Sequence, residues 1–159
     1  MDALNILLVD DDQSLATTLS HGLRKAMGET ILVDVCFSGP EALALLSSQS
    51  FDLVISDYHL PGMSGLELLT SVRQDHRETS LVLITGFGSD ELEKEAYRQA
   101  IGYVTKPFEL PHLAQLIQGV IWGKGISRNA DTPAHMRESD APADEHMSGI
   151  AMDKRGTSV

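Results

Sequence analysis

The sequence predicts an α/β protein in which five parallel strands form one doubly wound sheet with helices on both faces. Short apolar runs alternate with segments whose apolar residues recur at helical spacing, and this alternation repeats five times between residues 4 and 122. Turn-forming or polar residues follow each apolar run, as expected for buried strands. A chain of 159 residues suits one such domain with an appendage.

The predicted strands are short and rich in aliphatic residues. The first and third are the most apolar, so we expect both near the centre of the sheet. The strands are expected at residues 4–9, 31–37, 51–57, 81–84 and 103–105.

Helix-starting residues and apolar periodicity define the five predicted helices. Asp12 and Ser64 are expected N-caps, and Pro40 is tolerated in a first turn. A strongly charged helix with a thin apolar stripe is expected between Ser89 and Ala100. The inward-facing residues of the five helices are expected to be Leu15, Leu19, Leu23 and Ala26; Ala42, Leu45 and Leu46; Leu66, Leu69 and Val72; Leu92, Ala96 and Ala100; and Leu113, Leu116, Ile117, Val120 and Ile121.

Charge divides the chain into two parts. Residues 1–122 hold 7 Lys+Arg and 17 Asp+Glu, which gives −10, whereas residues 123–159 hold 5 and 6, which gives −1. An acidic domain is a poor nucleic-acid binder and suits a cation or a basic partner surface better. The last 37 residues lack periodic apolar positions, so we expect a disordered or weakly structured polar tail.

Cys36 is the only cysteine, so no intramolecular disulfide can form and a reducing cytoplasm is the expected compartment. Its place in the second predicted strand indicates a small buried hydrophobe rather than a redox group. We see no signal peptide and no run near the roughly 20 apolar residues that cross a bilayer.

Polar residues stand at or just after the ends of four predicted strands. They are Asp10 and Asp11, Asp57, Thr85 and Lys106. Because the carboxyl ends of parallel strands open on one rim, the fold should gather these side chains.

Neighbouring carboxylates repel one another unless a cation neutralises them. Mg²⁺ fits, since it prefers a few carboxylate oxygens together with waters. An aspartate, Mg²⁺, a hydroxyl and an ammonium together form a phosphoryl-transfer site, in which Asp57 is the candidate nucleophile.

Five motifs in this order resemble the receiver domain of two-component response regulators, the CheY-like superfamily. The resemblance covers residues 4 to about 122 and implies a flavodoxin-like sheet with strand order 2-1-3-4-5. The matching stretches are residues 6–12 (ILLVDDD), 52–57 (DLVISD), 60–65 (LPGMSG), 83–85 (LIT) and 103–108 (YVTKPF).

The resemblance implies a role for each matching residue. Asp57 would accept a phosphoryl group from a kinase histidine, and Asp10, Asp11, Asp57 and the backbone carbonyl of His59 would place Mg²⁺. Lys106 would contact the phosphoryl oxygens. The peptide bond between Lys106 and Pro107 would be cis. Thr85 and Tyr103 would be the hydroxyl and aromatic switch residues.

The implied protein is a phosphoacceptor rather than an enzyme. Its partners would be a sensor histidine kinase or a histidine phosphotransfer protein, and a downstream protein. We expect neither direct nucleic-acid binding nor membrane contact, and dimerisation through the last helices on phosphorylation stays open. Two departures stand out: residues 99–103 are about one residue shorter than usual, and Gly86 replaces the small alanine common after the switch threonine.

Two other functions remain as alternatives. A pseudo-receiver would act only as an interaction module without phosphorylation. A haloacid-dehalogenase-like phosphatase would use Asp10 as nucleophile and Asp12 as acid/base, although no predicted strand with an acidic pair follows Lys106 and Asp57 is left unexplained. In the receiver interpretation, Asp12 caps the first helix and the His59 side chain points outward.

Overall fold

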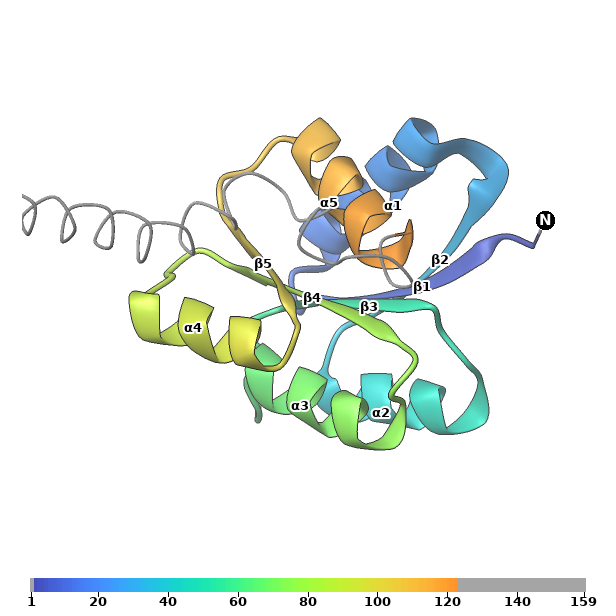
Figure 1. Cartoon of the computed structure of the whole chain (residues 1–159). Coiled ribbons are helices and arrows are strands. Elements are labelled where there is room, and N and C mark those ends of the chain that lie inside the picture. Colours follow the sequence, from blue (N-terminus) through green and yellow to red (C-terminus); the bar gives the residue numbers. More distant parts are fainter. Residues whose placement is uncertain (1, 123–159) are drawn as a thin grey trace, which may run out of the picture.

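The computed structural model describes residues 2–122, and the predicted tail at 123–159 lies outside the described residues. Five parallel strands form one sheet in the order β2-β1-β3-β4-β5, which confirms the predicted doubly wound, flavodoxin-like architecture (Figure 1). The first and third strands both lie in the interior of the sheet, as expected. The strands are β1 (Leu4–Val9), β2 (Ile31–Cys36), β3 (Leu53–Asp57), β4 (Ser80–Thr85) and β5 (Gly102–Thr105).

Two helices cover one face of the sheet and three cover the other (Figure 1). Helices α1 and α5 share one apolar core with the sheet, and α2, α3 and α4 share a second core on the opposite face. The inner strands β1, β3 and β4 have helices on both faces, which explains their nearly continuous apolar sequences, whereas the edge strand β2 leaves Leu32 and Asp34 exposed. The helices are α1 (Gln13–Met27), α2 (Gly39–Ser48), α3 (Gly65–Asp75), α4 (Asp90–Arg98) and α5 (Leu110–Trp122), with a short 3₁₀ helix at Gly28–Thr30.

Side-chain caps begin four of the helices. Asp12 accepts a hydrogen bond from the Leu15 N–H at 3.0 Å, so its predicted role as the α1 cap is confirmed. Ser64 forms a reciprocal capping box with Glu67 at the start of α3. The Ser38 and Ser89 hydroxyls accept hydrogen bonds from the Glu41 and Leu92 N–H groups as simple caps of α2 and α4, which satisfies amide groups that have no partner within a helix.

Two of the predicted inward positions, Ala26 and Ala100, are wrong because both residues are exposed. Met27 rather than Ala26 closes the buried stripe of α1. Leu66 packs partly buried against the second core, beside the fully buried Leu68 that the prediction omitted. Ala100 is exposed because α4 ends at Arg98, two residues before it. Ala100 itself has a φ of 58°, a left-handed turn that lets the short connection reach β5.

Within residues 2–122 no helix is both long and apolar enough to cross a membrane.

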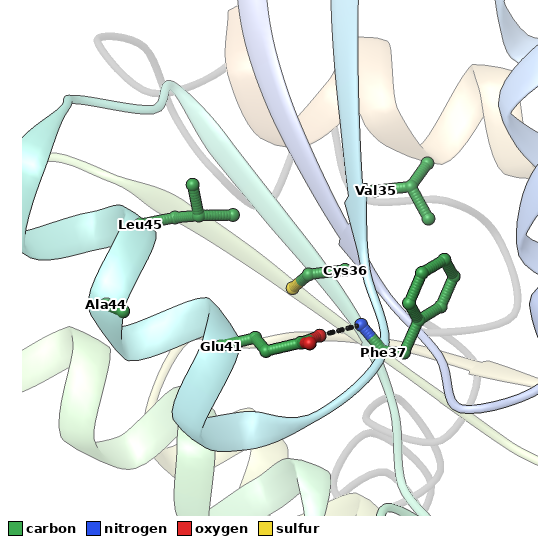
Figure 2. Close-up of a pocket in the computed structure, with 6 residues that line it drawn as sticks. All are labelled: Val35, Cys36, Phe37, Glu41, Ala44 and Leu45. Atoms are coloured by element: carbon green, nitrogen blue, oxygen red, sulfur yellow. Dashed lines mark hydrogen bonds between the residues drawn. The ribbon is translucent and has the colours of Figure 1, made fainter.

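A shallow hollow of about 350 Å³ lies beside the edge strand β2, between Val35, Phe37 and Leu45 (Figure 2). Glu41 also lines the hollow, and its carboxylate accepts a hydrogen bond from the Phe37 N–H at 2.7 Å. This contact fixes the turn from β2 into α2.

Cys36 lines this hollow and is 4% exposed, so the prediction that it is a buried hydrophobe is confirmed. Burial, reinforced by the negative charges of Glu41 and Asp34, raises the pKa of the Cys36 thiol to about 11. From an ordinary value of 9.0, this rise lowers the thiolate fraction near neutral pH about 100-fold.

Cys36 should therefore resist alkylation in the folded protein. We expect iodoacetamide at mildly alkaline pH to modify the native chain at least about 100-fold more slowly than the urea-unfolded chain, as followed by intact mass. Cys36→Ser is the control and should give no adduct in either state. A native rate within a few-fold of the unfolded rate would contradict the burial of this thiol.

Candidate functional site

Asp57 ends β3 at the carboxyl rim of the sheet, where its side chain is mostly buried but reaches the surface. Asp57 as a whole is 7% exposed. The Lys106 ammonium lies 2.6 Å from its Oδ1, and the His59 N–H donates to its Oδ2 at 2.9 Å. Both carboxylate oxygens thus have a cationic or hydrogen-bonding partner, which fixes the orientation of the carboxylate.

Strand register brings the other predicted site residues to the same rim. Asp57 pairs with Ile84 and Thr85 pairs with Thr105 in the parallel ladder. The Lys106 N–H then donates to the Thr85 carbonyl at 2.8 Å, so the two loops leave the sheet side by side. Residues nearly fifty positions apart, Asp57 and Lys106, therefore meet because consecutive parallel strands end together.

Asp10 is the second buried carboxylate of the site and is 5% exposed. Its Oδ1 accepts a hydrogen bond from the Asp12 N–H at 2.9 Å. Burial raises the pKa of Asp10 above its ordinary value, and the charges of Asp57 and Asp11 add to this rise, against the Asp12 hydrogen bond and the Lys106 charge. Asp11, by contrast, is exposed.

Lys106 is the cation that faces these carboxylates. Burial lowers the pKa of its ammonium, but the hydrogen bond and charge of Asp57, with the charges of Asp10 and Asp12, raise that pKa above its ordinary value overall. Lys106 therefore stays charged throughout the neutral range. The predicted cis bond between Lys106 and Pro107 is confirmed.

Thr85 ends β4 beside the carboxylates and is fully buried. Its Oγ1 accepts a hydrogen bond from the Phe87 N–H at 3.1 Å, which holds the start of the loop that leads to α4. Tyr103, the neighbouring aromatic residue on β5, is 4% exposed and packs in the second core. The two predicted switch residues are therefore near one loop.

His59 follows the site with an exposed side chain, as predicted. Its ring lies edge-on to Tyr58, at 5.1 Å between centroids, and to Phe87, at 5.7 Å. Phe87 is 80% exposed and was not identified from the sequence, because nothing in a Gly-Phe-Gly stretch indicates a contact with a distant histidine.

Gly65 is a second residue that sequence reasoning missed. A Cβ atom there would lie closer than 3.0 Å to the Asp57 carbonyl oxygen, a distance that real side chains do not keep. The Gly65 N–H instead donates to the Tyr58 carbonyl at 2.7 Å, so α3 begins directly behind the candidate nucleophile. Its place after the Pro-Gly turn was the available signal.

The donor set at the rim suits a hard divalent cation. Asp10 and Asp57 supply two buried carboxylates opposite one ammonium, which leaves excess negative charge. No group of three His, Cys, Asp or Glu side chains within residues 2–122 is arranged to hold a metal by itself. Mg²⁺ does not require one, since it retains waters and takes carbonyl oxygens beside one or two carboxylates.

Comparison with known proteins identifies the class. The family model described as "Response regulator receiver domain" matches residues 6–118. The chain therefore belongs to the receiver domain family of two-component response regulators.

Individual relatives agree with this assignment. The response regulator protein FleR of Pseudomonas aeruginosa is 39% identical over 132 residues, which cover 82% of this chain and 27% of FleR. The regulatory protein VanRB of Enterococcus faecalis is 35% identical over 77% of this chain and 54% of its own length. The structure of the chemotaxis response regulator CheY4 of Vibrio cholerae superposes with a TM-score of 0.66 at 31% identity, over 74% of this chain and 98% of that one. The chain thus spans about half or less of these two curated relatives.

The family assignment disfavours the phosphatase alternative, and the local geometry agrees. Asp12, which that alternative requires as acid/base, is exposed and uses its carboxylate to cap α1. Asp57 and Lys106, which it leaves without a shared role, form the ion pair at the centre of the site.

The raised pKa of Asp10 implies that this carboxyl group destabilises the folded protein at neutral pH. A carboxyl group whose folded-state pKa exceeds its unfolded value destabilises the fold once pH rises above the unfolded value. Asp10→Asn keeps an oxygen for the Asp12 N–H but removes the charge, so without Mg²⁺ it should raise Tm by a few degrees at neutral pH. The gain should shrink as pH falls and vanish below about pH 3.8, where Asp10 is neutral in both states.

Thermal unfolding followed by circular dichroism across this pH range measures the effect. The matched control is Asp11→Asn, an exposed acidic neighbour, which should change Tm far less. An Asp10→Asn variant that is less stable at every pH, or that gains stability towards acid, would contradict the electrostatic account.

Proposed function

We propose that Asp57 is the phosphoacceptor of a phosphorylation-activated receiver domain that takes its phosphoryl group from a histidine kinase. The observation that carries the proposal is the paired geometry of Asp57, with Lys106 on one oxygen and the His59 N–H on the other. The carboxylate is thereby oriented and partly shielded from water. An in-line attack on a phosphohistidine needs such a fixed, ionised nucleophile.

Lys106 serves as the fixed counter-charge of the transfer. Its ammonium neutralises the carboxylate before reaction and is placed to contact the phosphoryl oxygens afterwards. A lysine suits this role because its compact charge sits on a flexible side chain, so the ammonium can contact first the carboxylate oxygen and then the phosphoryl oxygens. Donors already in place stabilise developing charge without reorganising.

Mg²⁺ fits the same rim, where Asp10, Asp11, Asp57 and the His59 backbone carbonyl would hold it. When bound, the ion would offset the charge on the phosphoryl oxygens. The buried Asp10 supports this assignment: burial chiefly raises its pKa, the charges of Asp57 and Asp11 add to the rise, and a nearby cation would stabilise the charged carboxylate. The exposed Asp11 lies at the open side of the rim, within reach of solvent.

Thr85 and Tyr103 transmit the change. A phosphoryl group on Asp57 adds acceptor oxygens to which the Thr85 hydroxyl can donate, and a rotation of the Thr85 side chain towards them would break the bond that it accepts from the Phe87 N–H. The new contact favours one of two existing arrangements of the β4–α4 loop. A preference of about 5.5 kcal/mol would move such an equilibrium from 1:99 to 99:1.

The partners follow from this role. A sensor histidine kinase or a histidine phosphotransfer protein supplies the phosphoryl group, and a downstream protein reads the changed surface. The chain itself acts as a phosphoacceptor rather than as an enzyme with a separate substrate. The cytoplasm remains the predicted location, and direct nucleic-acid contact by this acidic domain is not expected.

Intact-mass measurement after incubation with acetyl phosphate and Mg²⁺ tests the proposal. We expect the wild-type chain to gain one phosphoryl group, and Asp57→Asn to gain none while keeping its circular dichroism spectrum. Removing Mg²⁺ with a chelator should lower the wild-type yield at least about tenfold, since charge on the transferred group is then poorly offset.

Asp52→Asn is the matched control, because Asp52 lies just before β3, at the opposite end of the strand from Asp57, and its exposed carboxylate accepts a hydrogen bond from the Asn5 N–H at 2.8 Å. It should be phosphorylated like the wild type. Absence of an adduct on the folded wild-type chain would favour the pseudo-receiver alternative. An adduct on Asp57→Asn would assign the phosphoryl group to another residue.

A further inference from the structure

The loop of residues 86–89, between β4 and α4, is held at both of its ends. The Phe87 N–H donates to Thr85 Oγ1 at 3.1 Å, and the Ser89 hydroxyl accepts the Leu92 N–H at 3.1 Å as the α4 cap. Gly88 lies between these two attachments, against the aromatic ring of Tyr103.

Gly88 leaves no room for a side chain. A Cβ atom there would lie closer than 3.0 Å to the Tyr103 hydroxyl, 3.3 Å from Tyr103 Cζ and 3.1 Å from Thr105 Cγ2. Gly28 and Gly62 are the glycines with positive φ among the described residues, so the Gly88 backbone conformation is open to other residues. The requirement for glycine here is one of space.

Gly86, two residues earlier in the same loop, differs in this respect. A Cβ atom at Gly86 would lie 3.9 Å from Lys106 Cδ and 4.0 Å from Lys106 Cβ, which is ordinary van der Waals contact. Both glycines are exposed loop residues. Of these two loop glycines, only Gly88 has a neighbour too close for a Cβ atom.

The Tyr103 hydroxyl is enclosed where it meets the loop. Tyr103 is 4% exposed, and burial raises the pKa of its phenol while a hydrogen bond with the Ser89 backbone opposes the rise. The phenol oxygen therefore lies against two consecutive loop residues, Gly88 and Ser89. Its position depends on the path of that loop.

We propose that Gly88 is a positioning residue whose missing side chain forms the seat of the Tyr103 hydroxyl, so that the ring lies inward only while position 88 has no Cβ. The link from this seat to signalling rests on the proposed function. Release of the Phe87 N–H by Thr85 moves the residue next to Gly88, and the seat therefore links Thr85 to Tyr103. The seat itself exists without phosphorylation.

Gly88→Ala, with Gly86→Ala as the matched control, tests the seat in the full chain without Mg²⁺ or phosphodonor. Fluorine NMR of protein labelled with 3-fluorotyrosine reports each of the three tyrosines, and Tyr103→Phe assigns the signal. We expect the Tyr103 signal of Gly88→Ala to move to a solvent-exposed shift and to titrate at lower pH than in the wild type. Gly86→Ala should retain the wild-type signal. An unchanged Tyr103 signal in folded Gly88→Ala would overturn the proposal.

A double-mutant cycle separates the seat from a general effect of alanine on the loop. Gly88→Ala should lower Tm in the wild-type background, and most of that loss should disappear when Tyr103→Phe removes the colliding oxygen. Equal losses in both backgrounds would overturn the proposal. Failure of the wild-type chain to accept a phosphoryl group would instead contradict the proposed function, and neither seat measurement uses phosphorylation.

Discussion

The crowding of two buried carboxylates around one ammonium is the constraint on which this site depends. Asp10 and Asp57 are both less than a tenth exposed, and Lys106 forms an ion pair with Asp57 while the charge of Asp10 also acts on its ammonium. Burial strengthens the attraction between Lys106 and Asp57 but also strengthens the repulsion between the carboxylates. The resting site therefore holds surplus negative charge, which a divalent cation can offset. The stability of the fold and the chemistry of the site are thus linked through one cluster of charges.

The parallel sheet makes this cluster possible. The inner strands β1, β3 and β4 are covered by helices on both faces (Figure 1), so their polar side chains are concentrated near the strand ends. β1, β3, β4 and β5 deliver Asp10, Asp57, Thr85 and Lys106 to the same rim. The loops beyond that rim are short and anchored by caps such as Ser64 and Ser89. In the proposed function, a change at Asp57 acts on the loop whose start Thr85 holds.

The strands, most inward-facing positions and the rim residues were predictable from the sequence, because burial on both faces and strand-end polarity leave clear local patterns. Helix ends were less predictable: Ala100 continues the apolar stripe of α4 in sequence but lies beyond the end of that helix. Contacts between distant residues left no such pattern. The edge-to-face contact of His59 with Phe87 and the collision that excludes a side chain at Gly88 depend on how two loops pack, which periodicity does not encode.

Hydrogen exchange at the Phe87 amide, measured by NMR with and without beryllofluoride and Mg²⁺, tests the central claim most directly. The claim is that charge added at Asp57 is read by Thr85, whose hydroxyl holds the Phe87 N–H in the resting state. The account predicts that the phosphoryl mimic accelerates exchange at Phe87, and that Asp57→Asn abolishes the acceleration. An unchanged Phe87 exchange rate, with the mimic demonstrably bound at Asp57, would contradict it.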